Sequence, residues 1–212
     1  MIVINKRSGE PPELSRYRKT MGATYDDLKG DPKQKVRESL VKEQGGICAY
    51  CMKRIQATSE DMKIEHYLPK AKKEFRDKEL CYQNMLAVCY GNEKIPDTDK
   101  TCDTSKQYEM LTINPISGYG ISKIKYKPIS GEIYSEDSEI QHDLNYTLNL
   151  NFIWLKQSRK AALDALKKML NDKYKGDWKL IAHKWHNKYQ TANPKQEYVG
   201  ILLWYLQKFA NR

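Results

Sequence analysis

The spacing of apolar and polar positions predicts helices at the start of the chain. Residues 10–22, EPPELSRYRKTMG, open with prolines and end in glycine, as short helices do. Residues 31–46 predict a second helix because Val36 and Leu40 repeat at i, i+4 and a Gly-Gly pair follows. Asp31 is the candidate N-cap of this helix, with proline at the first helical position.

The middle of the chain shows shorter patterns that predict strands, turns and brief helices. Residues 47–55 are rich in β-formers around a tight turn, and residues 62–69 predict a strand that ends at a proline. Residues 84–94 predict a helical turn that runs into a loop, and residues 102–111 predict another short helix. Residues 121–134 alternate apolar and polar side chains around Ser-Gly, which predicts a hairpin.

The last third of the chain is helical by its periodicity. Asn151 is a candidate cap for a helix whose apolar face is formed by five residues, Leu155, Leu163, Leu166, Met169 and Leu170. Residues 176–190 predict a further helix, and residues 193–211 predict a last one that starts at Asn-Pro.

These elements together predict an α+β protein in three parts. Residues 1–44 form an N-terminal helical segment, residues 45–135 a mixed core with the hairpin, and residues 136–212 a basic helical region. No apolar run approaches the roughly 18 residues of a membrane helix, and the N-terminus lacks the pattern of a secretory signal. The expected location is the cytoplasm, with no membrane partner.

Charge is distributed unevenly. The chain of 212 residues has a net charge of +10, and residues 151–212 hold thirteen Lys and Arg against four Asp and Glu. A basic segment of this kind favours an anionic partner, with nucleic acid the commonest. Lysines that only keep ordinary helices soluble are an equally good interpretation of the charge alone.

Five cysteines add candidate chemistry. An odd number argues against a disulfide framework in a cytoplasmic chain. Cys48 and Cys51 form a C-x2-C pair, and Cys89 and Cys102 form a wider second pair, so four thiolates are available for one tetrahedral zinc site. Cys81 is left over and is expected to be a buried small apolar residue. Ordinary core cysteines are the alternative interpretation.

His66 is the only histidine in the first 141 residues, and it lies between the two cysteine pairs. Glu65 precedes it, Asn84 lies downstream, and Asp103 follows the last cysteine. An imidazole that takes a proton from water, together with carboxylates that hold a hard cation, is what phosphodiester hydrolysis requires. A histidine that only satisfies hydrogen bonds on a strand is the alternative for His66 taken alone.

The segments CAYC, IEHYLPK, QNMLAVC and CDTSK, over about residues 44–107, resemble the HNH (ββα-metal) nucleases. With EPPEL, EQGGICAYC, INP and LNLN, the similarity over about residues 10–155 extends to the PtuB-type HNH endonucleases of Septu and retron anti-phage systems. The resemblance implies a ββα-metal core with a zinc knuckle between the N-terminal helices and a C-terminal helical extension. It also implies partnership with a PtuA-type ATPase, with a retron reverse transcriptase and its RNA and DNA as a further partner.

The resemblance assigns roles by position. His66 is the general base, Asn84 orients the loop of His66, and Glu65 and Asp103 hold a catalytic Mg²⁺ or Mn²⁺. The four cysteines Cys48, Cys51, Cys89 and Cys102 hold a structural Zn²⁺. The expected phosphate and nucleic-acid contacts are four lysines, Lys106, Lys70, Lys72 and Lys73. Asp103 departs from the family pattern, which usually has Asn or His there, and the insertion between Cys89 and Cys102 is long.

The remaining candidates are weaker. His183 and His186 lie three apart on a predicted helix, where a basic helix face explains them better than a metal site. The tail tryptophans are expected to pack between helices rather than stack on bases. The tail lysines favour nucleic acid, and some apolar surface of the tail favours docking of a partner.

Two functions therefore stay open at the level of sequence. The first is a metal-dependent endonuclease that cuts DNA by default, with RNA and tRNA as further candidates. The second is a zinc-binding adaptor that binds nucleic acid or a partner ATPase without chemistry. The combination of Glu65, His66, Asn84 and Asp103 favours the nuclease, because an adaptor needs none of these residues.

Overall fold

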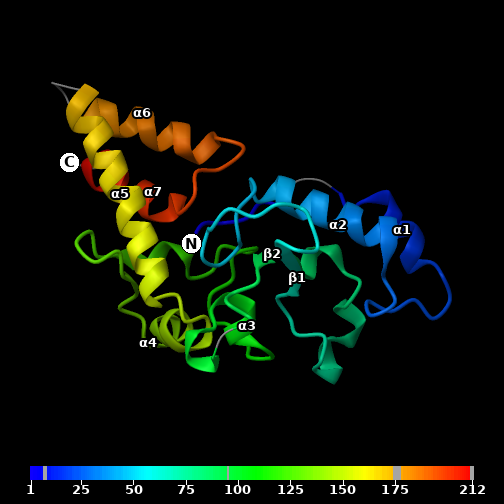
Figure 1. Cartoon of the computed structure of the whole chain (residues 1–212). Coiled ribbons are helices and arrows are strands. Elements are labelled where there is room, and N and C mark those ends of the chain that lie inside the picture. Colours follow the sequence, from blue (N-terminus) through cyan, green and yellow to red (C-terminus); the bar gives the residue numbers. More distant parts are fainter. Residues whose placement is uncertain (7–8, 95, 174–177, 211–212) are drawn as a thin grey trace.

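The computed structural model describes residues 1–6, 9–94, 96–173 and 178–210. Helices and small antiparallel sheets are both present, so the α+β prediction is confirmed at that level. Figure 1 shows the strands β1 and β2 beside the N-terminal helices, with the last three helices gathered at the other end of the molecule. The three-part division of the chain stays a prediction.

Two helices form the N-terminal segment, as predicted. Helix α1 spans Pro12–Arg18 and helix α2 spans Gly30–Glu43. Helix α2 buries Val36 and Leu40, the two residues whose spacing predicted it. The proposed cap is wrong, because Asp31 lies inside the first turn and Lys29 holds the N-cap position without a side-chain hydrogen bond.

The central element is an antiparallel hairpin of β1 (Met62–His66) and β2 (Met85–Cys89). Met62 pairs with Cys89 at one end, and His66 pairs with Met85 at the other. Residues 84–94 were predicted to form a helical turn, which is wrong because Met85–Cys89 form strand β2. All five residues of β2 are buried, and a fully buried strand gives a continuous apolar run without the alternation that identifies a half-exposed one.

Helix α3 (Cys102–Lys106) follows the hairpin and packs against β2, so the order is strand, strand, helix. The β-rich expectation for residues 47–55 reduces to one bridge between Ile47 and Arg54. That bridge closes the loop that carries the first cysteine pair.

The predicted second hairpin is present but short, with β3 at Lys125–Tyr126 and β4 at Ile133–Tyr134. Helix α4 (Ser138–His142) begins at Asp137, whose side chain accepts hydrogen bonds from two backbone amides, and continues into the π-helical turn η5 (Asp143–Thr147). Short 3-10 turns connect the other elements: η1 (Lys73–Lys78), η2 (Tyr82–Asn84), η3 (Asp97–Asp99) and η4 (Ile121–Lys123).

Three helices form the C-terminal region: α5 (Ile153–Lys173), α6 (Trp178–Thr191) and α7 (Val199–Ala210). Of the five residues predicted for the apolar face of α5, four are buried and Met169 is half-buried. Asn151 is not a cap for α5, because its side chain bonds both the amide and the carbonyl of Ile133.

Helix α7 starts later than the Asn-Pro pair predicted. The segment before it is used to hold the cysteine loop: Lys195 donates its amide to Gly45 and Tyr198 donates its amide to Met52. Glu197 accepts the amide of Arg54 at 2.8 Å. These long-range bonds fix an irregular path that a local pattern does not reveal.

Within the described residues, no helix is long and apolar enough to cross a membrane.

Candidate metal centre and catalytic hairpin

Four buried cysteines converge at the Cys89 end of the hairpin. Their Sγ atoms all lie within 4.8 Å of one another, and the described residues offer no other group of this kind. The separations are 3.9 Å for Cys48 to Cys102, 3.7 Å for Cys51 to Cys89 and 3.7 Å for Cys89 to Cys102. A tetrahedron of sulfurs with Zn–S bonds of about 2.3 Å has edges of about 3.8 Å, so the set fits zinc.

Local backbone geometry brings the sulfurs together. Cys48 accepts the amide of Met52 at 3.0 Å and donates its own amide to Lys53 at 2.9 Å, so the C-x2-C segment turns tightly. Cys102 has a positive φ of 55° and donates its amide to Leu148.

Burial opposes ionisation, but hydrogen bonds from the neighbouring thiols lower the pKa of Cys48 well below its usual range. The bond between Cys51 and Cys102 lowers the pKa of Cys51, but the pKa values of both residues are raised overall by their bonds to Cys48 and by burial. Without a cation the four sulfurs therefore hold one thiolate, and a bound Zn²⁺ would displace the remaining protons. The thiolate of Cys48 is the form that binds a metal ion.

Cys81 lies outside this group and is half-buried, where the sequence predicted a buried residue.

His66 lies at the opposite end of the hairpin and is only 5% exposed. Its Nε2 is 2.8 Å from the carbonyl oxygen of Glu79, and its ring meets the ring of Tyr25 edge-on at 4.4 Å. A carbonyl only accepts, so Nε2 carries the proton in the neutral ring and Nδ1 holds the lone pair. Desolvation by burial lowers the pKa of His66 to about 4, which keeps the imidazole neutral near pH 7.

Asn84 holds the loop that follows His66. Its Oδ1 accepts the amide of Leu68 at 2.8 Å, and its Nδ2 donates to the carbonyls of Leu68 at 3.0 Å and Lys78 at 3.3 Å. The carbonyl of Asn84 accepts the amide of Tyr67. One buried amide therefore ties both ends of the loop, and the role of Asn84 in orienting His66 stays a prediction.

Glu65 lies on the face of β1 opposite to His66, and its carboxyl group is hydrogen-bonded to that of Asp103. Burial raises the pKa of Glu65 well above its usual range, and the hydrogen bond with Asp103 raises it further. Burial opposes ionisation of Asp103, but the hydrogen bond from Glu65 and the ammonium of Lys63 lower its pKa. Two carboxyl groups that share one proton form a place where a divalent cation can replace that proton.

Two lysines flank this carboxyl pair. Lys106 is fully buried with its Nζ 2.8 Å from Glu65 Oε1, and Lys63 Nζ is 3.1 Å from Asp103 Oδ2. Tyr50 donates to the same Oε1 at 3.1 Å. Lys106 was predicted to contact phosphate, but its side chain has no exposed surface and its ammonium group lies against the Glu65 carboxyl group instead.

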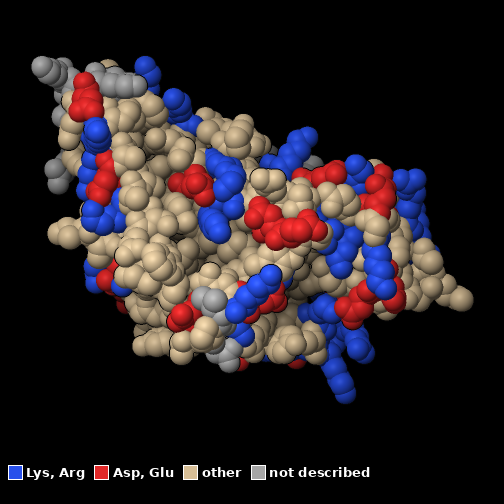
Figure 2. Space-filling model, in the orientation of Figure 1, with Lys and Arg blue, Asp and Glu red and all other residues tan. Residues whose placement is uncertain are grey.

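The lysines after Pro69 occupy different positions. Lys70 pairs with exposed Asp26 at 2.5 Å, and Lys72 is half-buried. Lys73 is exposed at the start of η1. Figure 2 shows Lys and Arg side chains gathered below the hairpin, over the segment that follows β1.

His66 and the carboxyl pair lie on opposite faces of β1, because successive side chains of a strand alternate. Among the described residues they do not converge as ligands of one ion. They remain close enough for the charges of Asp103 and Lys106 to act on the His66 ring. This arrangement suits a base beside a cation site better than a third ligand.

Sequence reasoning missed three partners of the site: Tyr25, Tyr50 and Lys63. Lys63 could have been predicted from the sequence, since it lies two residues before Glu65 on the same face of a strand. Tyr25 comes from the loop between α1 and α2, and no local signal connects it to His66.

The weaker candidates can also be placed. His183 and His186 have no third metal ligand among the described residues. Trp204 packs edge-on against Tyr126 at 5.8 Å, whereas Trp154 is 65% exposed, which contradicts the packing prediction for Trp154. The side chain of Trp178 lies outside the described residues.

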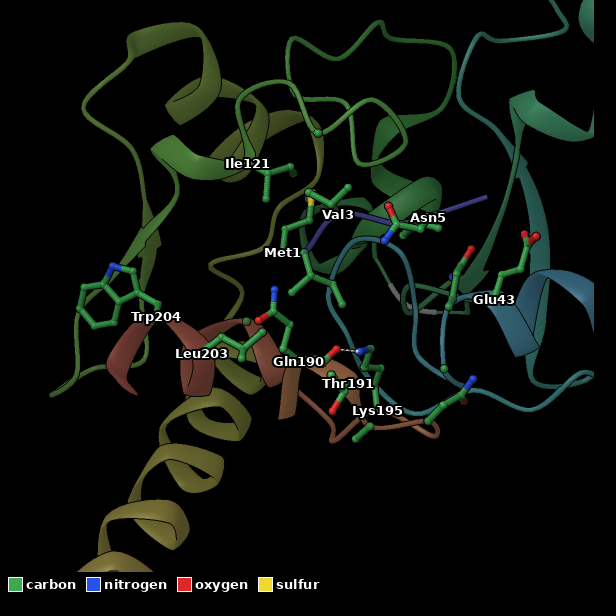
Figure 3. A pocket seen from close by; sticks show the side chains of 18 of the residues that line it. Met1, Val3, Asn5, Glu43, Ile121, Gln190, Thr191, Lys195, Leu203 and Trp204 are labelled. Carbon is green, nitrogen blue, oxygen red and sulfur yellow. Dashed lines mark hydrogen bonds between the residues drawn. The ribbon is translucent and has the colours of Figure 1, made fainter. Parts of the chain in front are cut away.

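A cavity of about 1090 Å³ lies apart from the hairpin site (Figure 3). Its walls come from the N-terminal segment, the end of α2 and helices α6 and α7, with Val3, Gln190 and Trp204 among the lining residues. His66, Glu65 and Asp103 do not line it, so this cavity is separate from the candidate catalytic centre.

Comparison with known proteins shows a partial similarity to a curated protein. The chain is 30% identical over 115 residues to a protein of Vibrio cholerae serotype O1 biovar El Tor described as "Retron Vc95 putative HNH endonuclease". The match covers 50% of this chain and 53% of that protein, so the chain spans about half the length of the curated relative it matches. No family model matches. This distant homologue supports an HNH endonuclease family and a nuclease role.

Proposed function

We propose that this protein is a metal-dependent HNH endonuclease that hydrolyses phosphodiester bonds. The observation that carries the proposal is the neutral His66, whose Nε2 is held by the Glu79 carbonyl and whose Nδ1 keeps its lone pair. A zinc-binding adaptor, the alternative, gives no reason to bury a histidine beside a pair of carboxyl groups.

The roles of the residues follow from their positions. His66 Nδ1 takes the proton of the attacking water, and the Glu79 carbonyl stabilises the imidazolium that forms. Asn84 keeps the loop after β1 in place so that the ring does not rotate. Glu65 and Asp103 would hold Mg²⁺ or Mn²⁺, which supplies charge neutralisation for the scissile phosphate and the departing oxygen. The four cysteines would hold Zn²⁺ as a structural ion.

The biological setting is part of the proposal. The relative's name places that protein in a retron, and the PtuB-like segments of this sequence favour an anti-phage effector that works with a PtuA-type ATPase. A reverse transcriptase with its RNA and DNA is the further expected partner in that setting. The basic C-terminal helices are proposed to contact nucleic acid, with exposed Trp154 offering apolar surface for a partner.

The test is a cleavage assay on DNA and RNA with and without Mg²⁺ or Mn²⁺, with the ATPase added in parallel. Cleavage that requires the cation supports the proposal, and the substrate that is cut settles the choice between DNA and RNA. Nucleic-acid binding without cleavage under all of these conditions would support the adaptor instead.

A further inference from the structure

Helix α2 presents two cations toward the candidate catalytic centre. Lys33 and Arg37 lie one turn apart on this helix, and neither forms an ion pair with a described carboxylate. Lys33 Nζ lies 4.7 Å from the centre of the Tyr25 ring, the same ring that meets His66 edge-on. Lys70 Nζ lies 5.5 Å from the centre of that ring. Two ammonium groups therefore share the tyrosine that contacts His66.

Arg37 carries an unsatisfied donor at the same place. Its Nε is buried and has no hydrogen-bond partner among the described residues, and such a group calls for an explanation. The charge of Arg37 acts on the Tyr25 hydroxyl, on which Asp103 and Glu65 also act. The guanidinium, the tyrosine and the carboxyl pair thus border the same region.

The crowding of these cations is unfavourable without an anion. Burial lowers the pKa of Lys33, and the nearby Arg37 guanidinium lowers it further. Lys33 also lies near the N-terminal end of α2, where the helix dipole disfavours a positive side chain and favours a bound anion. The described carboxylates that offset the cluster are exposed: Asp26 pairs with Lys70, and Glu60 feels the charge of Arg37.

We infer that Lys33 and Arg37 of helix α2, with Lys70 across the Tyr25 ring, bind a backbone phosphate of the nucleic acid beside His66. This inference rests on the proposed function, because it names the wall of the site that positions the substrate strand. A guanidinium and an ammonium are the donors that phosphate recognition uses most. The Tyr25 ring connects them to His66, because Lys33 lies against this ring and the ring meets the imidazole edge-on.

The experiment uses the full chain with His66→Ala, so that binding is measured without cleavage. Lys33→Gln and Arg37→Gln are added to it separately, and Lys35→Gln serves as the control. Lys35 is on the same helix but pairs with Glu38 at 3.0 Å, on a different face. All three changes remove one positive charge from α2. The probes are a fluorescently labelled short DNA duplex and an RNA of the same sequence.

Each of the two site variants should bind the preferred probe about tenfold more weakly, as the loss of one charge-assisted hydrogen bond predicts. Each should also reduce the slope of log affinity against log salt by about 0.9 on duplex DNA or about 0.7 on a single strand. Lys35→Gln should change neither value, and the melting temperature should stay the same in all three. A structural role alone would lower the melting temperature without changing the salt slope.

The outcomes separate this inference from the proposed function. If the wild-type chain cuts nucleic acid and the Lys33 and Arg37 variants bind like the Lys35 variant, the phosphate assignment falls and the nuclease stands. If the wild-type chain neither cuts nor binds either probe, both fall.

Discussion

The two ends of the β1–β2 hairpin differ in how many ligand positions of a bound ion the protein itself would fill. At the Cys89 end, four buried sulfurs supply every ligand that a tetrahedral ion needs. At the His66 end, two carboxyl groups supply fewer ligands than a hard cation takes, so positions remain for water and phosphate, and the neutral imidazole lies beside them as a base. A closed centre stabilises a fold, whereas an open centre performs chemistry. The short strands β1 and β2 join the two, so the first positions the second.

The largest effect should come from removing a cysteine of the four-sulfur centre at the Cys89 end. Cys102→Ser removes one of four ligands, and apparent binding energies of structural zinc are about 10 kcal/mol or more, so the protein should lose its zinc and unfold. Metal analysis and thermal melting check this. Cys81→Ser is the matched control and should keep one zinc per chain with an unchanged melting temperature. Retention of zinc by the Cys102 variant would contradict the assignment.

A substitution in the carboxyl pair at the His66 end should lower cleavage without releasing zinc. Asp103→Ala removes one half of the carboxyl pair, and cleavage should fall about a hundredfold or more, because a bound cation supplies several kcal/mol of transition-state stabilisation. Glu93→Gln is the control, since Glu93 also lies near Lys63, at 3.7 Å, but half-exposed. Equal losses of cleavage in the two variants would argue against a cation site at Asp103.

The buried imidazole predicts a dependence of stability on pH. The pKa of His66 is about 4 in the folded chain and 6.5 in the reference state, so the unfolded chain binds the proton first as pH falls. The free energy of unfolding should therefore be unaffected above pH 6.5 and should decrease by about 3 kcal/mol as pH falls toward 4. Denaturant titrations of the wild type and His66→Gln between these values measure this, and parallel curves would contradict the burial of His66.

The smallest of these effects concerns the loop that connects β1 to β2 at the His66 end of the hairpin. Asn84→Ala removes three hydrogen bonds from a buried amide and should cost about 2 kcal/mol of unfolding free energy. Cleavage should fall as well, because the ring of His66 loses its fixed loop. Gln83→Ala changes the exposed neighbour and should stay within about 0.5 kcal/mol of the wild type. Unchanged cleavage by the Asn84 variant would separate the loop from catalysis.

Much of this arrangement could be predicted from sequence because its signals are local. The C-x2-C pair, the strand that ends at His66 and the helix that begins at Cys102 all have short-range patterns. Asn84 could be assigned from its place in the sequence, because it lies between His66 and Cys102.

What could not be predicted depends on contacts between distant segments. Residues 85–89 were misassigned because a strand buried on both faces shows no alternation. Lys106 was assigned to phosphate because composition does not reveal that a lysine side chain points inward to Glu65. Tyr25 escaped notice because it reaches His66 from a loop some forty residues earlier in the chain.

Cleavage by the His66→Ala protein, with zinc content determined on the same sample, tests the central claim most directly. The account predicts that this variant keeps its zinc and its fold and loses cation-dependent cleavage of the nucleic acid that the wild type cuts. Cleavage at the wild-type rate by zinc-loaded His66→Ala protein would contradict it.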